Sequence, residues 1–278
     1  MVPDIASLLA RSSELSDISD SPRLDAELLL CHVLGKSRTY LYTWPEYRLL
    51  PAEIAGFDAL FARRARGEPI AYLIGRREFW SLSLRVSEAT LIPRPETELL
   101  VALALALPLG GAALVADLGT GTGAVALALA SERPLWQLSA VDAFPDALAL
   151  AERNRRELGY DNVRVFQSDW FSAIAGARFD LVVSNPPYID EADTHLQQGD
   201  VRFEPTSALV APDGGFGDLV VIIQNAGEHL NAGGWLLLEH GWQQGEMVRQ
   251  LMKQAGFLAV TTHLDLAGRE RVTVGRNA

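Results

Sequence analysis

Five consecutive residues, Ser184 to Tyr188 (Ser-Asn-Pro-Pro-Tyr), combine the groups in this sequence that are best suited to chemistry on a planar nitrogen. Pro186 and Pro187 have no N–H and hold the chain extended, while their carbonyls can accept hydrogen bonds. Asn185 adds a side-chain acceptor, and Tyr188 adds a flat ring. An –NH2 group on an amide or on adenine delocalises its lone pair. Two acceptors that hold its hydrogens, the Asn185 oxygen and the Pro186 carbonyl, would favour lone-pair density pointing at an electrophile. The motif alone also fits a loop that merely ends a strand.

A glycine-rich loop, Gly119 to Gly123, is the second candidate site. Such a loop between a strand and a helix lets a ligand approach the backbone closely, and Asp142, about 20 residues further on, could accept from ribose hydroxyls. The spacing Gly-x-Gly-x-Gly differs from the G-x-G-x-x-G of dinucleotide sites, so an oxidoreductase is a distant alternative. Asp117 before the loop suits a cationic amino-acid end or a sulfonium. Asp169 and Trp170 add an acceptor and a ring for an adenine, and the combination favours S-adenosylmethionine.

These residues must be positioned by the alternating pattern that begins near residue 112. Apolar runs typical of strands are followed by helical patterns, and this alternation predicts a mostly parallel sheet flanked by helices. Ligands of such sheets bind at the carboxyl ends of the strands, which is where the marked residues fall. The seven expected strands lie at 113–119, 137–142, 162–169, 179–185, 235–241, 257–265 and 271–276.

The first part of the chain reads as helices with clear start and stop signals. One helix is expected between Ser21 and Gly35 and another between Pro51 and Gly67. Their expected apolar faces are Leu24, Leu28 and Cys31 in the first helix, and Ile54, Phe57 and Phe61 in the second. Arg63, Arg64 and Arg66 end the second helix, where they match the helix dipole or contact an acidic or RNA-bound partner.

The following stretch predicts a boundary between domains. Residues 79–92 alternate as in a β-hairpin, and 96–107 form an apolar helix. We therefore expect a helical N-terminal domain at 1–75, a β-hairpin linker at 76–92 and a catalytic α/β domain at 93–278.

Composition narrows the function classes. The net charge of −11 is divided as −1 over residues 1–92 and −10 over the rest, which argues against duplex DNA as the main partner because DNA-binding surfaces are basic. Cys31 is the single cysteine and no histidines stand at metal-ligand spacing, so we expect no metal site. Neither a secretion signal nor a membrane-spanning run is visible, which predicts a cytoplasmic protein without membrane contact.

With these motifs assembled, the sequence resembles the bacterial peptide chain release factor glutamine methyltransferase family (PrmC/HemK) over almost its whole length. The resemblance rests on RRARGEPIAYLIGRREFWSL, LIPRPETE, DLGTGTGAVALALA, SNPPYID, VRFEPTSAL and LEHGWQQGE. It implies a class I methyltransferase-like (Rossmann-like) α/β fold with a seven-stranded mostly parallel sheet, preceded by a small helical N-terminal domain. We expect that helical domain to recognise the protein substrate, since a single amide offers little specific area. The implied reaction moves a methyl group from S-adenosyl-L-methionine, leaving S-adenosyl-L-homocysteine, to the side-chain amide of the glutamine in the Gly-Gly-Gln motif of class 1 release factors.

The resemblance also implies roles for single residues. Those expected at the cofactor are Gly119, Thr120, Gly121, Thr122, Gly123, Asp142, Asp169, Trp170 and Asn185. Those expected at the glutamine are Asn185, Pro186, Pro187 and Tyr188, of which Asn185, Pro186 and Tyr188 are the expected catalytic residues. Phe79 and residues 94–97 are expected near the cleft.

Two rival interpretations stay open, an amino-methyltransferase acting on adenine or cytosine in nucleic acid and a degenerate domain that only binds. We expect a monomer with no direct DNA binding.

Overall fold

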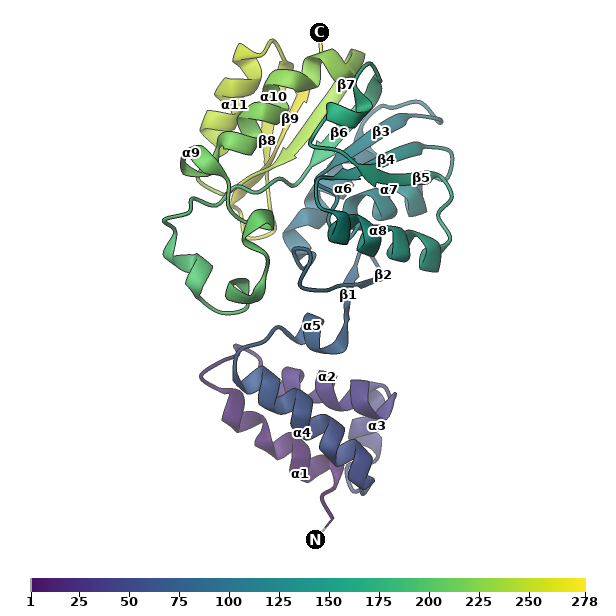
Figure 1. Cartoon of the computed structure of the whole chain (residues 1–278), viewed down its shortest axis with the longest axis vertical. Coiled ribbons are helices and arrows are strands. Elements are labelled where there is room, and N and C mark those ends of the chain that lie inside the picture. The colour runs from purple at the N-terminus through teal and green to yellow at the C-terminus, as the bar shows by residue number, and fades with distance from the viewer. Residues whose placement is uncertain (1) are drawn as a thin grey trace. The chain divides into compact units, whose positions relative to one another are not determined.

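The computed structural model describes residues 2–278, and the chain forms two compact units. The first contains the residues up to Arg76 together with Thr194–Phe203, and the second contains Arg77–Asp193 and Glu204–Ala278 (Figure 1). The chain therefore leaves the second unit after Asp193, contributes ten residues to the first and returns at Glu204. Within residues 2–278, no helix has both the length and the apolar character needed to cross a membrane.

The first unit is helical. Its elements are α1 (Ile5–Ala10), the 3₁₀ turn η1 (Arg11–Leu15), α2 (Pro22–Leu34), α3 (Arg38–Thr43), α4 (Pro51–Ala65) and α5 (Ile70–Ile74), with the short turns η4 (Thr194–Gln197) and η5 (Val201–Phe203) in the returning segment. Helix α2 begins at Pro22 and ends at Gly35, whose φ of 62° is a left-handed conformation that glycine adopts without strain. Both limits of α2 agree with the sequence prediction.

The buried face of α2 differs from the predicted one. Ala26, Leu29 and Leu30 lie in the core of the unit, whereas Leu24 is exposed and Leu28 is only half-buried. The reason is that α2 also buries two acids, which need cationic partners inside the unit. Periodicity of apolar residues could not reveal this, because it ignores charged residues that are buried in pairs.

The ion pairs of α2 also explain Arg64, near the end of α4. Its guanidinium bonds Asp25 at 2.7 Å and Asp200 at 2.8 Å, and its side chain is 5% exposed. Glu27, the other buried acid, accepts hydrogen bonds from Arg38 and Tyr42. Arg64 is thus a structural cation of the first unit, a role that the sequence analysis did not consider. Phe57 and Phe61 of the same helix are buried as predicted.

A small hairpin precedes the main sheet. Its strands are β1 (Arg76–Phe79) and β2 (Leu82–Arg85), which lie within the predicted linker 76–92 but begin before residues 79–92, where the alternation was expected to form the hairpin. Trp80 and Ser81 form the turn, with φ values of 50° and 60°. Positive φ at both central residues matches the twist of a two-residue hairpin, but neither residue type signals this conformation, which is why the prediction was displaced.

The main sheet consists of β3 (Leu114–Leu118), β4 (Gln137–Asp142), β5 (Val163–Gln167), β6 (Phe179–Ser184), β7 (Leu230–Glu239), β8 (Leu258–Leu264) and β9 (Glu270–Arg276). Their spatial order is β5-β4-β3-β6-β7-β9-β8, and β9 alone runs antiparallel to the other strands of this sheet. The predicted seven-stranded, mostly parallel α/β fold is confirmed. The strand order reverses between β3 and β6, which leaves a crevice at the carboxyl ends of these two strands.

Helices cover both faces of the sheet (Figure 1). The second unit contains the short turns η2 (Pro95–Thr97), η3 (Ser172–Ile174) and η6 (Thr206–Ala208) and the helices α6 (Glu98–Ala106), α7 (Ala124–Glu132), α8 (Pro145–Leu158), α9 (Pro212–Gly215), α10 (Gly217–His229) and α11 (Gly245–Gln254). Successive strand residues point to opposite faces. Val115 accordingly packs with α6 and α7, and Ala116 with α10 and α11. The site thus rests on strand ends that are fixed by two apolar cores.

Candidate functional site

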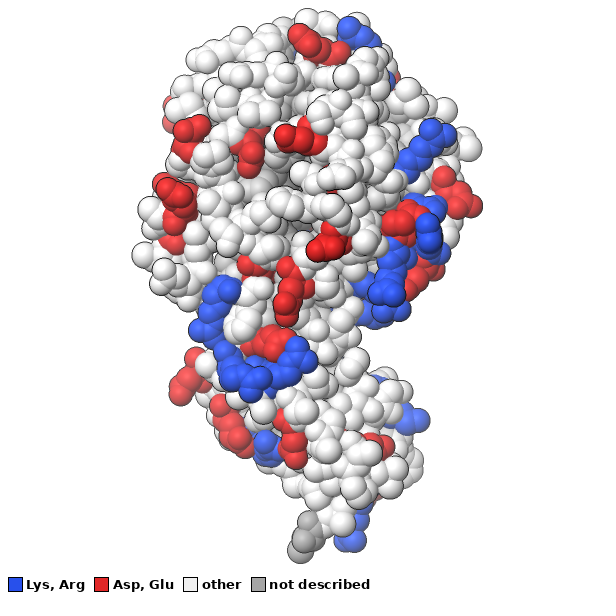
Figure 2. All heavy atoms as spheres, in the orientation of Figure 1, with Lys and Arg blue, Asp and Glu red and all other residues white. Residues whose placement is uncertain are grey.

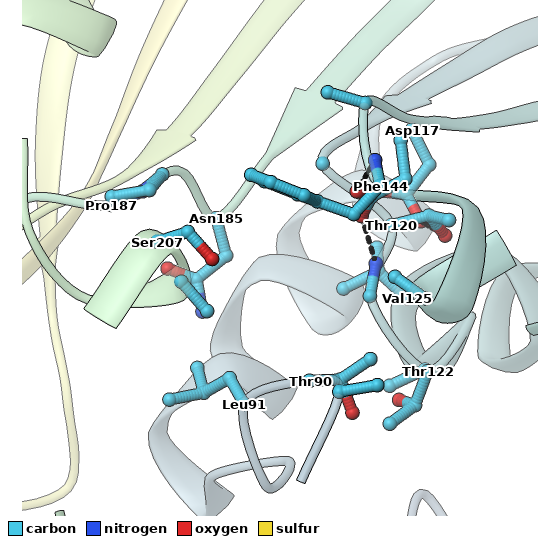
Figure 3. A pocket seen from close by; sticks show the side chains of 18 of the residues that line it. Thr90, Leu91, Asp117, Thr120, Thr122, Val125, Phe144, Asn185, Pro187 and Ser207 are labelled. Carbon is cyan, nitrogen blue, oxygen red and sulfur yellow. Dashed lines mark hydrogen bonds between the residues drawn. The ribbon is translucent and has the colours of Figure 1, made fainter. Parts of the chain in front are cut away.

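A cavity of about 380 Å³ opens where the strand order reverses. Its walls come from the ends of β3, β4, β5 and β6, from residues 89–97 and from the segment around η6. Figure 3 shows Asn185 and Ser207 on one side of the cavity and Asp117, Thr120 and Val125 on the other. The side with the glycine loop and the side with Asn185 are built differently.

Asp117, in the strand that precedes the glycine loop, stabilises the loop by hydrogen bonds. Its Oδ2 accepts hydrogen bonds from the Thr120 hydroxyl at 2.6 Å and from the Ala126 amide at 3.2 Å. Gly119 and Gly123 have φ values of 68° and 84°, a region where a side chain causes strain. Burial raises the pKa of Asp117 to about 7, against the lowering effect of these two hydrogen bonds. Asp117 therefore supports the loop as well as lining the cavity.

Asp142, the last residue of β4, binds the loop from the neighbouring strand. Its two carboxylate oxygens accept hydrogen bonds from the amides of Gly121 at 2.9 Å and Phe144 at 3.0 Å. Burial raises its pKa, and these backbone hydrogen bonds oppose that shift. Each carboxylate oxygen keeps a second lone pair, so the side chain can accept further hydrogen bonds from a ligand.

Two aromatic residues line the cavity, Trp170 after β5 and Phe144 after β4. Trp170 has a φ of 45°, and its carbonyl accepts a hydrogen bond from the Ser168 hydroxyl at 2.7 Å. A Cβ atom on Gly119 would lie 3.4 Å from the Trp170 ring, so the loop and the ring lie close together. Phe144 also lines the cavity and is 50% exposed. Its half-free ring is available for contact with a planar ligand.

The nitrogen of the Asn185 side-chain amide takes part in a hydrogen bond. Its Nδ2 donates to the Thr97 hydroxyl oxygen at 3.2 Å, which orients the amide. No residue between 2 and 278 donates a hydrogen bond to Asn185 Oδ1 or to the Pro186 carbonyl. Two acceptors at the end of β6 therefore receive no hydrogen bond from these residues, and of the two residues Asn185 lines the cavity.

Tyr188 is anchored by backbone and side-chain contacts. Its amide donates to the Leu209 carbonyl at 3.2 Å, and its hydroxyl donates to Glu239 at 3.4 Å. The segment that carries Leu209 is held in turn by Glu204, which accepts from the Ile92 amide at 2.9 Å and pairs with Arg94. The stretch after Asn185 is thus tied to two segments distant in sequence.

Most of the residues that the sequence analysis singled out line one cavity. They are Asp117, Gly119, Thr120, Gly121, Thr122, Asp142, Asp169, Trp170, Asn185 and Pro187, together with Arg94 and Thr97. Gly123, Pro186 and Tyr188 adjoin it without lining it, and Phe79 packs in the core.

The sequence analysis assigned no role to several other lining residues, namely Thr90, Leu91, Phe144, Ser207, Ala208, Val210 and Asp218. Phe144 was the easiest of these to find from the sequence, since it follows Asp142, the last residue of its strand, by two positions.

The chemistry of the lining fits S-adenosyl-L-methionine better than a dinucleotide. The acidic residues of the lining are Asp117, Asp142, Asp169 and Asp218, and its one cation is Arg94, which is paired with Glu204. A diphosphate needs cations or free backbone donors, whereas carboxylates suit hydroxyl donors and a positively charged ligand.

Known structures share the fold. A methyltransferase from Pyrococcus furiosus aligns with a TM-score of 0.56 and 17% identity, over 80% of this chain and 99% of that chain. The 16S rRNA N2 G1207 methyltransferase of Thermus thermophilus, solved with AdoMet and guanosine, aligns with a TM-score of 0.51 and 19% identity, over 73% of this chain and 50% of the other.

Sequence comparison is far more specific. Residues 8–75 match the PrmC N-terminal domain, and residues 96–222 match the methyltransferase small domain. The release factor glutamine methyltransferase of Escherichia coli is 58% identical over 93% of this chain and 93% of its own length. The enzyme of that name from Pseudomonas aeruginosa is 56% identical over 96% of this chain and 97% of its own length. At this identity and coverage, the chain belongs to the release factor glutamine methyltransferase family.

Proposed function

We propose that this chain transfers the methyl group of S-adenosyl-L-methionine to the side-chain amide nitrogen of the glutamine in the Gly-Gly-Gln motif of class 1 peptide chain release factors. The observation that carries the proposal is that two acceptors at the end of β6, Asn185 Oδ1 and the Pro186 carbonyl, receive no hydrogen bond from residues 2–278. A primary amide presents two N–H donors in one plane, which is the pattern that two convergent acceptors bind.

The chain's own groups would act by orientation and electrostatics. Asn185 Oδ1 and the Pro186 carbonyl would each hold one amide hydrogen, and Pro187 and Tyr188 would confine the plane of the amide. Hydrogen bonds to both hydrogens favour lone-pair density directed out of the amide plane. Among residues 2–278, the carboxylates that line the cavity lie on the glycine-loop side or on α10, so none of them is expected to act as a strong base on the amide. The released proton would therefore pass to water, and a modest rate is expected.

The glycine-loop side would hold the cofactor. When bound, S-adenosyl-L-methionine supplies an electrophilic methyl group on a sulfonium centre. Asp142 would accept from the ribose hydroxyls, and Trp170 would pack against the adenine. The backbone of Gly119–Gly123 and the side chains of Thr120, Thr122 and Asp169 would line the rest of the ligand, with Asn185 between cofactor and amide.

The protein substrate needs more surface than one amide offers. We assign its recognition to the helical residues 1–75, with 76–92 as the linker and 93–278 as the methyltransferase domain. We further propose that the enzyme acts as a cytoplasmic monomer. Deleting residues 1–75 should then weaken affinity for the release factor far more than affinity for the cofactor, provided that the remainder folds.

Charge argues against nucleic acid as the substrate. Figure 2 shows acidic side chains scattered over this face of the second unit, with basic ones gathered near α8. Three arginines of that region pair locally, Arg155 and Arg156 with Glu152 and Arg85 with Glu157. Paired arginines contribute little to the binding of a phosphate backbone, which requires free cations.

The deciding experiment offers radiolabelled S-adenosyl-L-methionine and three acceptors to the purified protein. The acceptors are a release factor, the same factor with its Gly-Gly-Gln glutamine changed to alanine, and duplex DNA. Label on the unaltered factor alone is expected. Label on DNA, or equal label on both forms of the factor, would overturn the proposed substrate.

A further inference from the structure

Gln244, the residue before α11, uses its whole side-chain amide in contacts inside the second unit. It is 9% exposed. Its Nε2 donates to the Tyr188 carbonyl at 3.1 Å and to the Gly215 carbonyl at 3.2 Å. Its Oε1 accepts from the Gly241 amide at 2.8 Å. Two carbonyl oxygens and one N–H match the two donors and the acceptor of a primary amide, so the partners fix the orientation of this side chain.

The two-proline segment that Gln244 contacts has few hydrogen bonds of its own. Pro186 and Pro187 have no N–H to donate, and a residue before a proline is confined to extended conformations, so the run is stiff. No residue between 2 and 278 donates a hydrogen bond to the carbonyl of Pro186 or Pro187. The pairing of β6 with β3 up to Ser184 fixes the start of the run. The direction of its end therefore depends on the hydrogen bonds of Tyr188.

The backbone of Tyr188 forms one hydrogen bond on each side of its peptide plane. Its amide donates to the Leu209 carbonyl at 3.2 Å, and its carbonyl accepts from Gln244 Nε2. Gly215 packs against this carbonyl so closely that a Cβ atom on Gly215 would lie 2.4 Å from the oxygen. In the part of the chain that the structure describes, Gln244 is the one donor to the Tyr188 carbonyl. Gln244 thus holds the end of the two-proline segment.

We propose that Gln244 is a positioning residue for the methyl transfer, because its hydrogen bond to the Tyr188 carbonyl keeps the Pro186 carbonyl and the Tyr188 ring aligned with the substrate amide. The Pro186 acceptor belongs to the backbone, so its direction is set by the bonds at the two ends of the stiff segment. Gln244 itself lies outside the cavity lining and acts only through this segment. This inference rests on the proposed function, since it concerns the acceptors of the glutamine amide.

A purely structural role for Gln244 predicts a different result. Loss of a buried amide that forms three hydrogen bonds lowers the free energy of unfolding, because the partners are left unpaired. Fewer folded molecules then give less total activity, while each folded molecule keeps its rate. The number of folded molecules is the number of S-adenosyl-L-methionine sites, which calorimetry counts. Dividing the rate by that number separates the two roles.

The test compares Gln244→Glu and Gln244→Met with wild type in methylation of an intact release factor. An ionised glutamate keeps the shape and the acceptor but has no hydrogen for the two carbonyls, and methionine offers no N–H donor. In both variants kcat per cofactor site should fall by roughly 10- to 100-fold, since a displacement of about 1 Å can cost that much. KM for the factor should change little, because most of the contact area lies outside the amide. Affinity for S-adenosyl-L-methionine should also change little.

The chain offers a matched control in the adjacent residue. Gln243 is also a glutamine but is exposed, so Gln243→Glu and Gln243→Met should keep the wild-type kcat. Gly241→Ala is a milder variant that leaves the Gln244 amide in place. Its Cβ would lie 3.0 Å from Gln244 Oε1 and would displace that side chain slightly, so a smaller loss of kcat is expected. This variant decides the matter if both Gln244 variants fail to fold.

Two outcomes would overturn the proposal. One is a wild-type kcat per cofactor site in Gln244→Glu or Gln244→Met or, where these do not fold, in Gly241→Ala. The other is a loss of cofactor affinity as large as the loss of kcat, which would make Gln244 a general support of the cavity. A wild-type protein that leaves the glutamine unmethylated would instead refute the proposed function itself.

Discussion

The two sides of the cavity obtain their order in opposite ways. On the glycine-loop side, Asp117 accepts a hydrogen bond from Thr120 of the loop, and Asp142, at the end of the neighbouring strand, accepts one from Gly121 of the loop. On the other side, Asn185 and Tyr188 are fixed by Thr97 and Glu239, which lie 88 and 51 residues away in the chain. The first side is assembled largely from local sequence and the second from tertiary contacts.

The difference reflects what each side must do. A cofactor that binds in every reaction cycle needs a binding site of rigid shape, which glycines and backbone donors provide. The amide site needs acceptors that stay unsatisfied until the substrate arrives, and unsatisfied acceptors are kept in place only by neighbours that hold the rest of the same side chain. Substitutions on the two sides should therefore separate cofactor affinity from turnover.

The largest effect is expected for Asn185→Ala. Loss of one of the two amide acceptors should lower kcat by on the order of 10²- to 10³-fold, while affinity for S-adenosyl-L-methionine falls but remains measurable. Radiometric assay and calorimetry measure the two quantities. Asn185→Asp, which keeps an acceptor but adds charge, should also be severely impaired. Asn225→Ala, at an exposed site on α10, is the control, and full activity in Asn185→Ala would refute the assignment.

Asp142→Asn is expected to affect cofactor affinity more than turnover. An asparagine keeps one acceptor but brings an NH2 group towards the amides of Gly121 or Phe144, so the loop and the ribose site both lose a charge-assisted bond. Affinity for S-adenosyl-L-methionine should fall by about 10- to 100-fold. Titration calorimetry measures this, with the exposed Asp146→Asn as control. Unchanged affinity would show that Asp142 has only a structural role.

A smaller effect, on stability, is expected for Gly123→Ala. A Cβ here would lie 3.0 Å from Leu127 Cδ1, and φ is 84°. The left-handed conformation costs a residue with a side chain roughly 1–2 kcal/mol, which should lower Tm by roughly 3–6 °C. Gly110→Ala, where the added atom meets open space, should leave Tm nearly unchanged. Equal melting temperatures for the two variants would mean that the loop is not held in this conformation.

The smallest effect is expected for Phe144→Ala. Its ring is half exposed, so removal should cost about 1 kcal/mol of ligand contact and weaken cofactor binding about 5-fold. Leu135→Ala, also exposed but outside the cavity lining, is the control in the same calorimetric titration. A loss as large as that of Asp142→Asn would show that the ring, and not the carboxylate, dominates on this side.

The sequence by itself determined the elements whose signals are local. The limits of α2 were readable from Pro22 and Gly35, and the seven strands from apolar runs, because these signals act on neighbouring residues. The grouping of Asp142, Trp170 and Asn185 was also readable, since parallel strands end at one edge of their sheet.

Only the tertiary structure decided the features that depend on distant partners. The buried face of α2 depends on Arg64, and the hairpin depends on left-handed Trp80 and Ser81, for which the sequence has no signal. Glu239 reads as one polar residue at the end of an apolar strand, and only the pairing of β7 with β6 brings it behind Asn185 and Tyr188. Sequence periodicity records which residues are buried together, whereas the direction of a hydrogen bond depends on atoms that folding brings into contact.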